Sequence, residues 1–199
     1  MSIATYSELK SSVANWLNRT DLTSEIPDFI SLAESRMAHE LRIPTIEKVA
    51  YIIPDSAGYA TLPTDFLAIK DMFFNGKPLT RETLSMLHSQ PAASGTPTSF
   101  AREANELVFY PTPTLGSTDK IKVIYYYSVS ELSDVATTND LLKAVPELYL
   151  YGSLVEAATF LGSDSSRWEQ AYQTAFSRSM NHARQAEVSG ATPYVANGY

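Results

Sequence analysis

Cysteine is absent from the 199 residues of the sequence. This absence excludes disulfide bonds, thiolate metal sites and cysteine nucleophiles together, and it leaves the compartment open. Charged residues are also scarce at 19%, against about 25% in an average domain, and a surface poor in charge mildly favours a protein that works in contact with other proteins. Basic residues are fewer than acidic ones: there are 15 Lys and Arg and 22 Asp and Glu, which gives a net charge of -7. Strong electrostatic binding of nucleic acid over a broad surface is therefore not expected.

Long hydrophobic runs are missing as well. No stretch approaches the roughly 20 apolar residues that a membrane-spanning helix needs. The N-terminus lacks the basic start and apolar run of a signal peptide. We therefore expect a soluble protein of the cytoplasm with no membrane partner.

Familiar catalytic and metal-binding patterns are absent too. The histidines His39, His88 and His182 lie far apart and lack the close spacing of a zinc site. No Gly-rich phosphate loop, nucleophile elbow or dinucleotide fingerprint occurs. Pairs such as Glu34 with Glu40, or Glu103 with Glu106, resemble the carboxylates of glycoside hydrolases, but 22 acidic residues form such pairs by chance. The sequence predicts no catalytic residue, no metal site and no cofactor.

The most informative stretch is Val145–Val188, which reads as two helices. Residues 146–161 are apolar on almost every side, so other elements must surround this helix. Residues 163–188 carry a one-sided stripe, with a predicted capping box formed by Ser166 and Glu169. At about 1.5 Å per residue the second helix is roughly 35 Å long, more than a bundle of this size requires. A projecting helix suggests a partner.

Two further helices are predicted near the N-terminus. Thr5 and Glu8 have capping-box spacing ahead of a helix at Tyr6–Leu17. Ser24 is the predicted N-cap of the second helix, with Pro27 tolerated in its first turn. Its apolar residues keep helical spacing as far as Leu41, and the helix is expected to end before Pro44.

The middle of the chain changes to the periodicity of strands. Val49, Tyr51 and Ile53 alternate like a half-buried strand, and Asn75-Gly76 is a strong hairpin signal. A short helix is expected within 81–88 and an exposed loop over 89–98. The other predicted strands cover residues 59–62, 66–74, 77–79, 99–102, 106–110 and 120–127. This spacing of short strands is typical of a small sandwich or barrel.

Together these elements predict an α+β protein, in which two N-terminal and two C-terminal helices form a four-helix bundle with an inserted small β-sandwich or barrel. The length suits one domain with a large insertion. We expect the first half of the bundle at 1–44, the β-rich insertion at 45–131, the second half of the bundle at 132–188, and a C-terminal tail at 189–199.

Three residues are candidates for contacts between subunits. In Tyr125-Tyr126-Tyr127, alternation directs Tyr126 to the opposite face from its neighbours. Core packing with the phenol groups at the rim explains this stretch, and the alternative is an anchor in an interface, for which Tyr126 is the candidate. Arg36 and Arg42, on the second predicted helix, are expected to pair with acidic residues of the same subunit or of another.

Several stretches together resemble the head-to-tail adaptor (connector) proteins of tailed bacteriophages, especially those of short-tailed phages. The resemblance spans about residues 5–187, and its specificity lies in the order and spacing of the whole set. It rests on residues 25–34 (EIPDFISLAE) with 41–42 (LR), 62–66 (LPTDF), 74–79 (FNGKPL), 109–113 (FYPTP) and 148–158 (LYLYGSLVEAA).

This resemblance implies a structural virion protein, located at the neck of the virion and in the host cytoplasm during assembly. Copies of the chain would form a ring, of about twelve subunits, below the portal protein. The ring would extend the channel for packaged double-stranded DNA without binding it tightly, and would present a docking surface to a tail or nozzle protein. The C-terminal segment would reach the portal, which makes its portal-binding candidates Arg184, Val188, Tyr194, Val195 and Tyr199.

Two alternatives to this interpretation remain. One is another tail-completion protein or a ring on the tail side of the neck. The other is a peptidoglycan hydrolase carried by the virion, suggested only by the abundant carboxylates and by the phage context.

Overall fold

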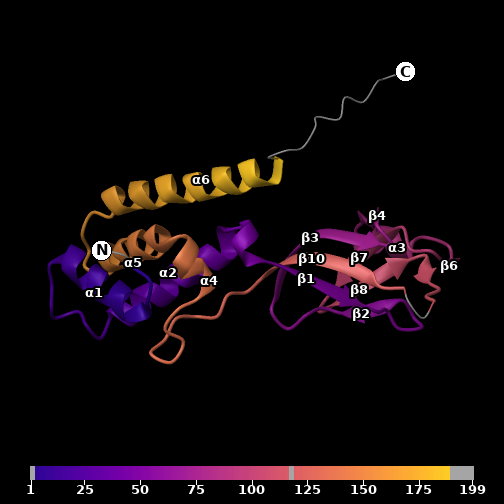
Figure 1. Ribbon diagram of the computed structural model, residues 1–199, viewed down its shortest axis with the longest axis horizontal. Helices are drawn as coiled ribbons and strands as arrows, with labels where there is room; N and C mark the ends of the chain where they lie inside the picture. The colour runs from indigo at the N-terminus through magenta and orange to yellow at the C-terminus, as the bar shows by residue number, and fades with distance from the viewer. Residues whose placement is uncertain (1–2, 117–118, 189–199) are drawn as a thin grey trace, which may run out of the picture. The chain divides into compact units, whose positions relative to one another are not determined.

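The computed structural model describes residues 3–116 and 119–188 and has an α+β fold (Figure 1). The chain divides into two compact units. Residues 1–46 and 129–199 form a helical unit, and residues 47–128 form a β unit.

The two N-terminal helices begin with different caps. Helix α1 spans Tyr6–Leu17, and the predicted capping box is confirmed, because Thr5 Oγ1 accepts from the Glu8 amide at 3.3 Å and Glu8 Oε2 accepts from the Thr5 amide at 3.0 Å. Helix α2 spans Ile26–Glu40, and here the predicted Ser24 cap is wrong. Glu25 occupies the N-cap position without a side-chain cap, and the Ser24 hydroxyl bonds to Glu25 Oε2. A 3₁₀ turn, η1 (Pro44–Ile46), follows.

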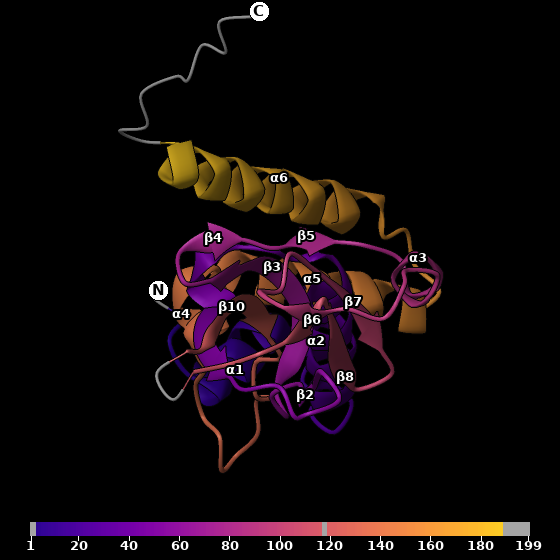
Figure 2. The same cartoon turned by 90° about the vertical axis from the view of Figure 1, so that its right-hand side faces the viewer.

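Helix α5 (Pro146–Phe160) is the centre of the helical unit, as its nearly uniform apolar composition predicts. Nine of its fifteen residues are buried. It packs against α1, α2, α6 and the short helix α4 (Asp140–Ala144), which the sequence analysis did not predict. Both views place α6 on one side of α5 and α1 on the other (Figures 1 and 2).

Helix α6 (Ser166–Val188) carries the predicted stripe, with Tyr172, Ala175 and Ala183 buried along it. The predicted capping box at its start is wrong. Ser166 is already the first helical residue, its hydroxyl donates to Asp164 Oδ1, and Glu169 pairs with Arg36 instead. The sequence could not distinguish these partners, because Arg36 lies on a helix distant in sequence.

Two four-stranded sheets form most of the β unit. The first has the order β1-β10-β3-β4, with bounds Glu47–Ile52, Ile121–Tyr127, Phe66–Phe74 and Lys77–Pro78. The second has the order β2-β8-β7-β5, with bounds Tyr59–Thr61, Glu106–Tyr110, Ser99–Glu103 and Thr80–Arg81. Strands β6 (Ser94–Gly95) and β9 (Thr112–Pro113) form a separate short pair. The Asn75-Gly76 hairpin is confirmed, with φ of 47° and 80° at these residues, which is the positive-φ geometry of this turn.

The two sheets differ in how their faces are covered. On the second sheet, helix α3 (Leu84–His88) places Leu87 against Ala101 and Val108. On the first sheet, one face holds the buried residues Ile121, Val123 and Tyr125. The other face, which we call the uncovered face, carries the exposed side chains of Val49 and Tyr51.

The strand that contains Val49 and Tyr51 is present as β1, which ends one residue before Ile53. The predicted half-burial is wrong for all three residues. Their exposed fractions are 52%, 63% and 66%. The register places Val49 opposite Ile124, on the uncovered face, whereas Ala50 and Ile52 lie opposite the buried Val123 and Ile121. Both alternating sets contain apolar residues, so periodicity alone could not show which set faces inward.

Candidate functional site

The described residues form surfaces that could bind macromolecules. No group of three or more His, Asp and Glu side chains within residues 3–116 and 119–188 is arranged to hold a metal ion. His39 and His182 are exposed on α2 and α6. His88 Nε2 lies 3.7 Å from Glu103 Oε2, a pair that is charged on both sides only when the histidine is protonated.

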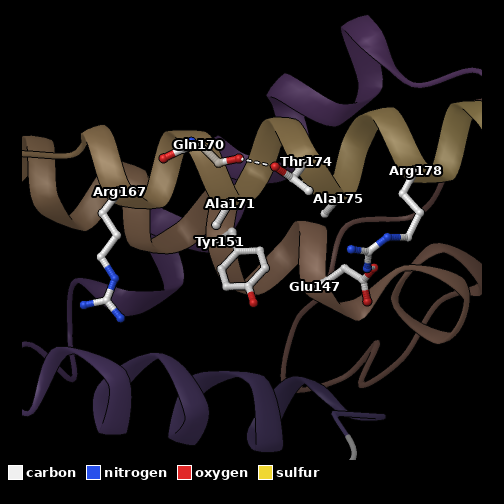
Figure 3. A pocket seen from close by; sticks show the side chains of 8 residues that line it. All are labelled: Glu147, Tyr151, Arg167, Gln170, Ala171, Thr174, Ala175 and Arg178. Atoms are coloured by element: carbon white, nitrogen blue, oxygen red, sulfur yellow. Dashed lines mark hydrogen bonds and ion pairs between the residues drawn. The ribbon is translucent and has the colours of Figure 1, made fainter.

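A groove of about 410 Å³ lies on the helical unit between α6 and the central helix α5 (Figure 3). Tyr151 of α5 points into its middle, while Arg167 and Arg178 of α6 stand at its two ends. Small side chains of α6 lie between the two arginines, so the groove is open enough to accept a partner's side chains. The lining residues are Glu147, Tyr151, Arg167, Gln170, Ala171, Thr174, Ala175 and Arg178.

Aromatic side chains border the Arg167 end of the groove. The Trp16 ring of α1 makes edge contacts with Tyr151 at 6.0 Å and with Trp168 at 5.5 Å between ring centroids. Arg167 stacks over Trp168 at 4.7 Å, and no carboxylate of the described residues pairs with it. Arg178 lies 3.6 Å from Glu147, a separation that gives only a weak exposed ion pair. This end of the groove therefore offers an arginine that has no carboxylate partner among the described residues and lies beside apolar surface.

Arg36 of α2 contacts two residues of α6, Glu169 and Tyr172. Its guanidinium donates to both carboxylate oxygens of Glu169, with Nη1 to Oε2 at 2.9 Å, and it lies 4.3 Å above the Tyr172 ring. The guanidinium lowers the pKa of Glu169, and burial raises the pKa of Tyr172 to about 12. The Tyr172 hydroxyl has no hydrogen-bond partner among the described residues.

We predict that Arg36→Ala destabilises the helical unit by about 1–2 kcal/mol, because it removes a bidentate pair and a stacked cation at a half-buried site. Arg36→Lys should cost less, since lysine keeps the charge but not the fork of two donors. Urea unfolding followed by circular dichroism measures both values. Equal stability of Arg36→Ala and the unchanged protein would show that the pair contributes nothing.

The other two predicted subunit-interface residues occupy different settings. Arg42 donates to the carbonyl oxygens of Ala38 at 3.0 Å and Leu41 at 2.6 Å, beyond the C-terminal end of α2. Tyr126 lies on the uncovered face of the first sheet, while Tyr125 and Tyr127 are buried on the opposite face as predicted. Arg36 and Arg42 belong to the helical unit and Tyr126 to the β unit, and the role of all three in a subunit interface stays a prediction.

The uncovered face of the first sheet exposes apolar side chains. Val49 and Tyr51 lie there beside the half-buried Ile124 and Tyr126, and the exposed Ile53 follows directly after β1. Beside them is a hollow of about 390 Å³ lined by Tyr51, Phe73, Asn75, Gly76, Lys120 and Lys122. Exposed apolar patches of this kind typically mark sites of contact with another protein. Strand β1 also ends the order of this sheet, so one of its backbone edges is unpaired among the described strands.

Glu34 of α2 holds the segment that leads from the β unit back to the helices. The Leu132 amide donates to Glu34 Oε1 at 3.0 Å, and the Tyr149 hydroxyl also bonds to this carboxylate. Burial raises the pKa of Glu34 to about 7, and these two hydrogen bonds act in the opposite direction. The sequence offered Glu34 only as a weak candidate for catalysis. In the structure its carboxylate instead stabilises the segment around Leu132.

The predicted portal-binding residues are only partly described. Arg184 is exposed near the end of α6, and Val188 is the last residue of that helix. Tyr194, Val195 and Tyr199 lie outside the described residues. The groove and the uncovered sheet face were not found from the sequence, because both depend on which elements become neighbours.

Comparison with protein families decides the identity. The model of the family described as SU10 adaptor protein matches residues 4–195. The chain belongs to the SU10 adaptor protein family. It is thus a structural virion protein of a tailed bacteriophage, a head-to-tail adaptor, as the sequence motifs suggested. A search of curated proteins finds no match.

Among the described helices of the adaptor, none is both long enough and apolar enough to cross a membrane.

Proposed function

We propose that this adaptor forms a ring of about twelve copies below the portal protein, extends the DNA channel and presents the docking surface for a tail or nozzle protein. The match to the adaptor family over residues 4–195 carries this proposal. The exposed apolar face of the first sheet supports it, because a surface of this kind is stable in water chiefly when an assembly covers it. The subunit would be made in the host cytoplasm and end at the neck of the virion.

The charge distribution suits a channel through which DNA must slide. The helical unit has 14 acidic and 8 basic residues, a net charge of -6, and the β unit has 8 acidic and 7 basic residues, a net charge of -1. Tight binding of duplex DNA needs several lysine or arginine contacts to phosphates, each of which releases counterions. A ring of such subunits would let DNA pass without holding it.

The proposal is tested by mixing the purified adaptor with the portal protein of the same phage and imaging the complexes by negative-stain electron microscopy. A ring of adaptor stacked on one end of the portal is expected. Failure to associate with either the isolated portal or DNA-filled heads would refute the proposal. A monomer in the absence of portal would agree with it, if the portal acts as the template for the ring.

The end of the chain is proposed to contact the portal. Deletion of residues 190–199 should leave a folded monomer with the thermal stability of the full chain, because these residues follow the last helix. It should weaken binding to the portal by about tenfold or more, the loss expected when a few buried contacts of an interface are removed. Biolayer interferometry on immobilised portal measures the affinity. Arg184→Ala tests the adjoining helix, and unchanged affinity of both variants would contradict a contact made by this end.

A further inference from the structure

We propose that the groove between α5 and α6 binds helix α2 of a second copy of this chain, so that neighbouring adaptors join head to tail through their helical units. This inference rests on the proposed ring and assigns one of its contacts to named surfaces.

The groove supplies one half of the contact. Trp16 is 47% exposed at its edge and stands next to Tyr151 in the middle of the groove. The half-buried Ala171 leaves room for an apolar side chain to reach Tyr151. Arg167 has no acidic partner within the described chain, in a unit whose net charge is -6. A partner that binds in this groove should therefore carry a carboxylate, to pair with Arg167, and an exposed apolar side chain close to it.

Helix α2 supplies the other half. Asp28, Leu32, Ser35 and His39 follow one another at helical spacing of four, three and four residues, and all four are exposed. Leu32 is 53% exposed, which is unusual for a leucine on a packed helix, and Asp28 pairs with no cation of the described residues. The side chains at positions 31 and 35 are serines, so another helix can approach closely around Leu32.

The groove between α5 and α6 and the exposed side of α2 complement each other in charge and in shape. With α2 of one copy lying in the groove of the next, Leu32 packs on Tyr151 and Ala171. Asp28, one helical turn away, then reaches the guanidinium of Arg167. A leucine on an aromatic floor next to a partly desolvated ion pair is a common form of helix-in-groove recognition.

The two surfaces belong to different helices. The groove is lined by residues of α5 and α6 alone, whereas the exposed side chains of Asp28 and Leu32 belong to α2. A contact between different surfaces of identical subunits is heterologous, and repetition of such a contact produces a ring when the rotation closes. Pairing of α2 with the groove therefore produces a chain of subunits, whereas a symmetric dimer would use one surface twice.

Disulfide trapping tests this contact directly, because the chain contains no cysteine and every cross-link comes from the introduced pair. The variant combines Leu32→Cys with Ala171→Cys. It is assembled on the portal, oxidised and separated by non-reducing SDS–PAGE, and a ladder of covalent trimers and larger species is expected. Each single-cysteine variant should stop at a dimer, and Leu32→Cys combined with Val135→Cys, at a position 96% exposed, controls for random collisions.

The outcomes separate this inference from the proposed function. Rings on the portal without a ladder, or an equal ladder from the Val135 control, would overturn the α2–groove contact and leave the proposed function standing. Absence of any ring on the portal would refute both.

Charge exchange provides a second test without cysteines. Asp28→Arg and Arg167→Asp should each lower the fraction of portals that carry a ring by roughly tenfold, while the double variant recovers most of that loss. Lys143→Asp makes the same change in net charge as Arg167→Asp at an exposed site on α4, and it should assemble normally. Thermal melts confirm that each variant is folded. No recovery in the double variant would contradict the pairing of Asp28 with Arg167.

Discussion

Gly152→Leu is expected to destabilise the adaptor by about 3 kcal/mol or more, because this position has no room for a side chain. A Cβ atom there would lie 2.9 Å from the Ala33 Cβ and 3.4 Å from Tyr172 Cε2. These neighbours belong to α2 and α6, so the added atoms would push both helices away from α5. Gly152→Ala should cost less, since alanine adds one methyl group and improves helix propensity by about 1 kcal/mol.

Urea denaturation followed by circular dichroism measures the loss. The control is Thr159→Leu, which introduces the same side chain at an exposed position of α5 and should change stability by no more than about 0.5 kcal/mol. Equal stability of Gly152→Leu and Thr159→Leu would mean that α2 and α6 do not pack on α5 as closely as described.

We expect the free energy of unfolding of Glu34→Gln, measured relative to that of the unchanged protein, to increase as the pH rises. The pKa of Glu34 is about 7 in the folded chain, above its ordinary value of 4.5, so the folded state holds a proton that the unfolded state releases. The stability that Glu34 contributes is complete below pH 4.5 and is lost as the pH rises through 7. Because the carboxylate is partly exposed, we expect a change of about 1–2 kcal/mol across this interval.

The measurement is urea unfolding of both proteins between about pH 3 and pH 8.5. The Gln side chain keeps an oxygen that can accept from the Leu132 amide, so the comparison isolates the proton. Glu169→Gln supplies a control of opposite sign, since Arg36 lowers the pKa of Glu169 and its contribution is lost as the pH falls below 4.5. A stability difference between Glu34→Gln and the unchanged protein that does not vary with pH would contradict a raised pKa.

Local signals in the sequence were sufficient for most elements. Helix α1 was predicted with its correct bounds, because its capping box joins residues three apart. The Asn75-Gly76 hairpin and the burial of Tyr125 and Tyr127 follow from turn chemistry and alternation in the same way. Helix α4 was missed because five residues are too few to show periodicity.

Errors arose where a side chain selects among partners distant in sequence. Glu169 has the spacing to cap α6, but Arg36 offers two donors in a half-buried site, and this pair forms instead. Val49, Tyr51 and Ile53 have the pattern of an inward face, yet pairing with β10 directs the other set inward. The groove could not be predicted, because its walls come from α5 and α6, and the packing of these two helices against each other is a property of the folded chain.

A reconstruction of the virion neck by electron cryomicroscopy tests the central claim most directly. The account predicts a ring of this adaptor directly below the portal, with the duplex DNA channel continuing through it and α2 of each subunit in the α5–α6 groove of its neighbour. A neck in which another protein occupies the position below the portal, with this chain located elsewhere in the particle, would contradict it.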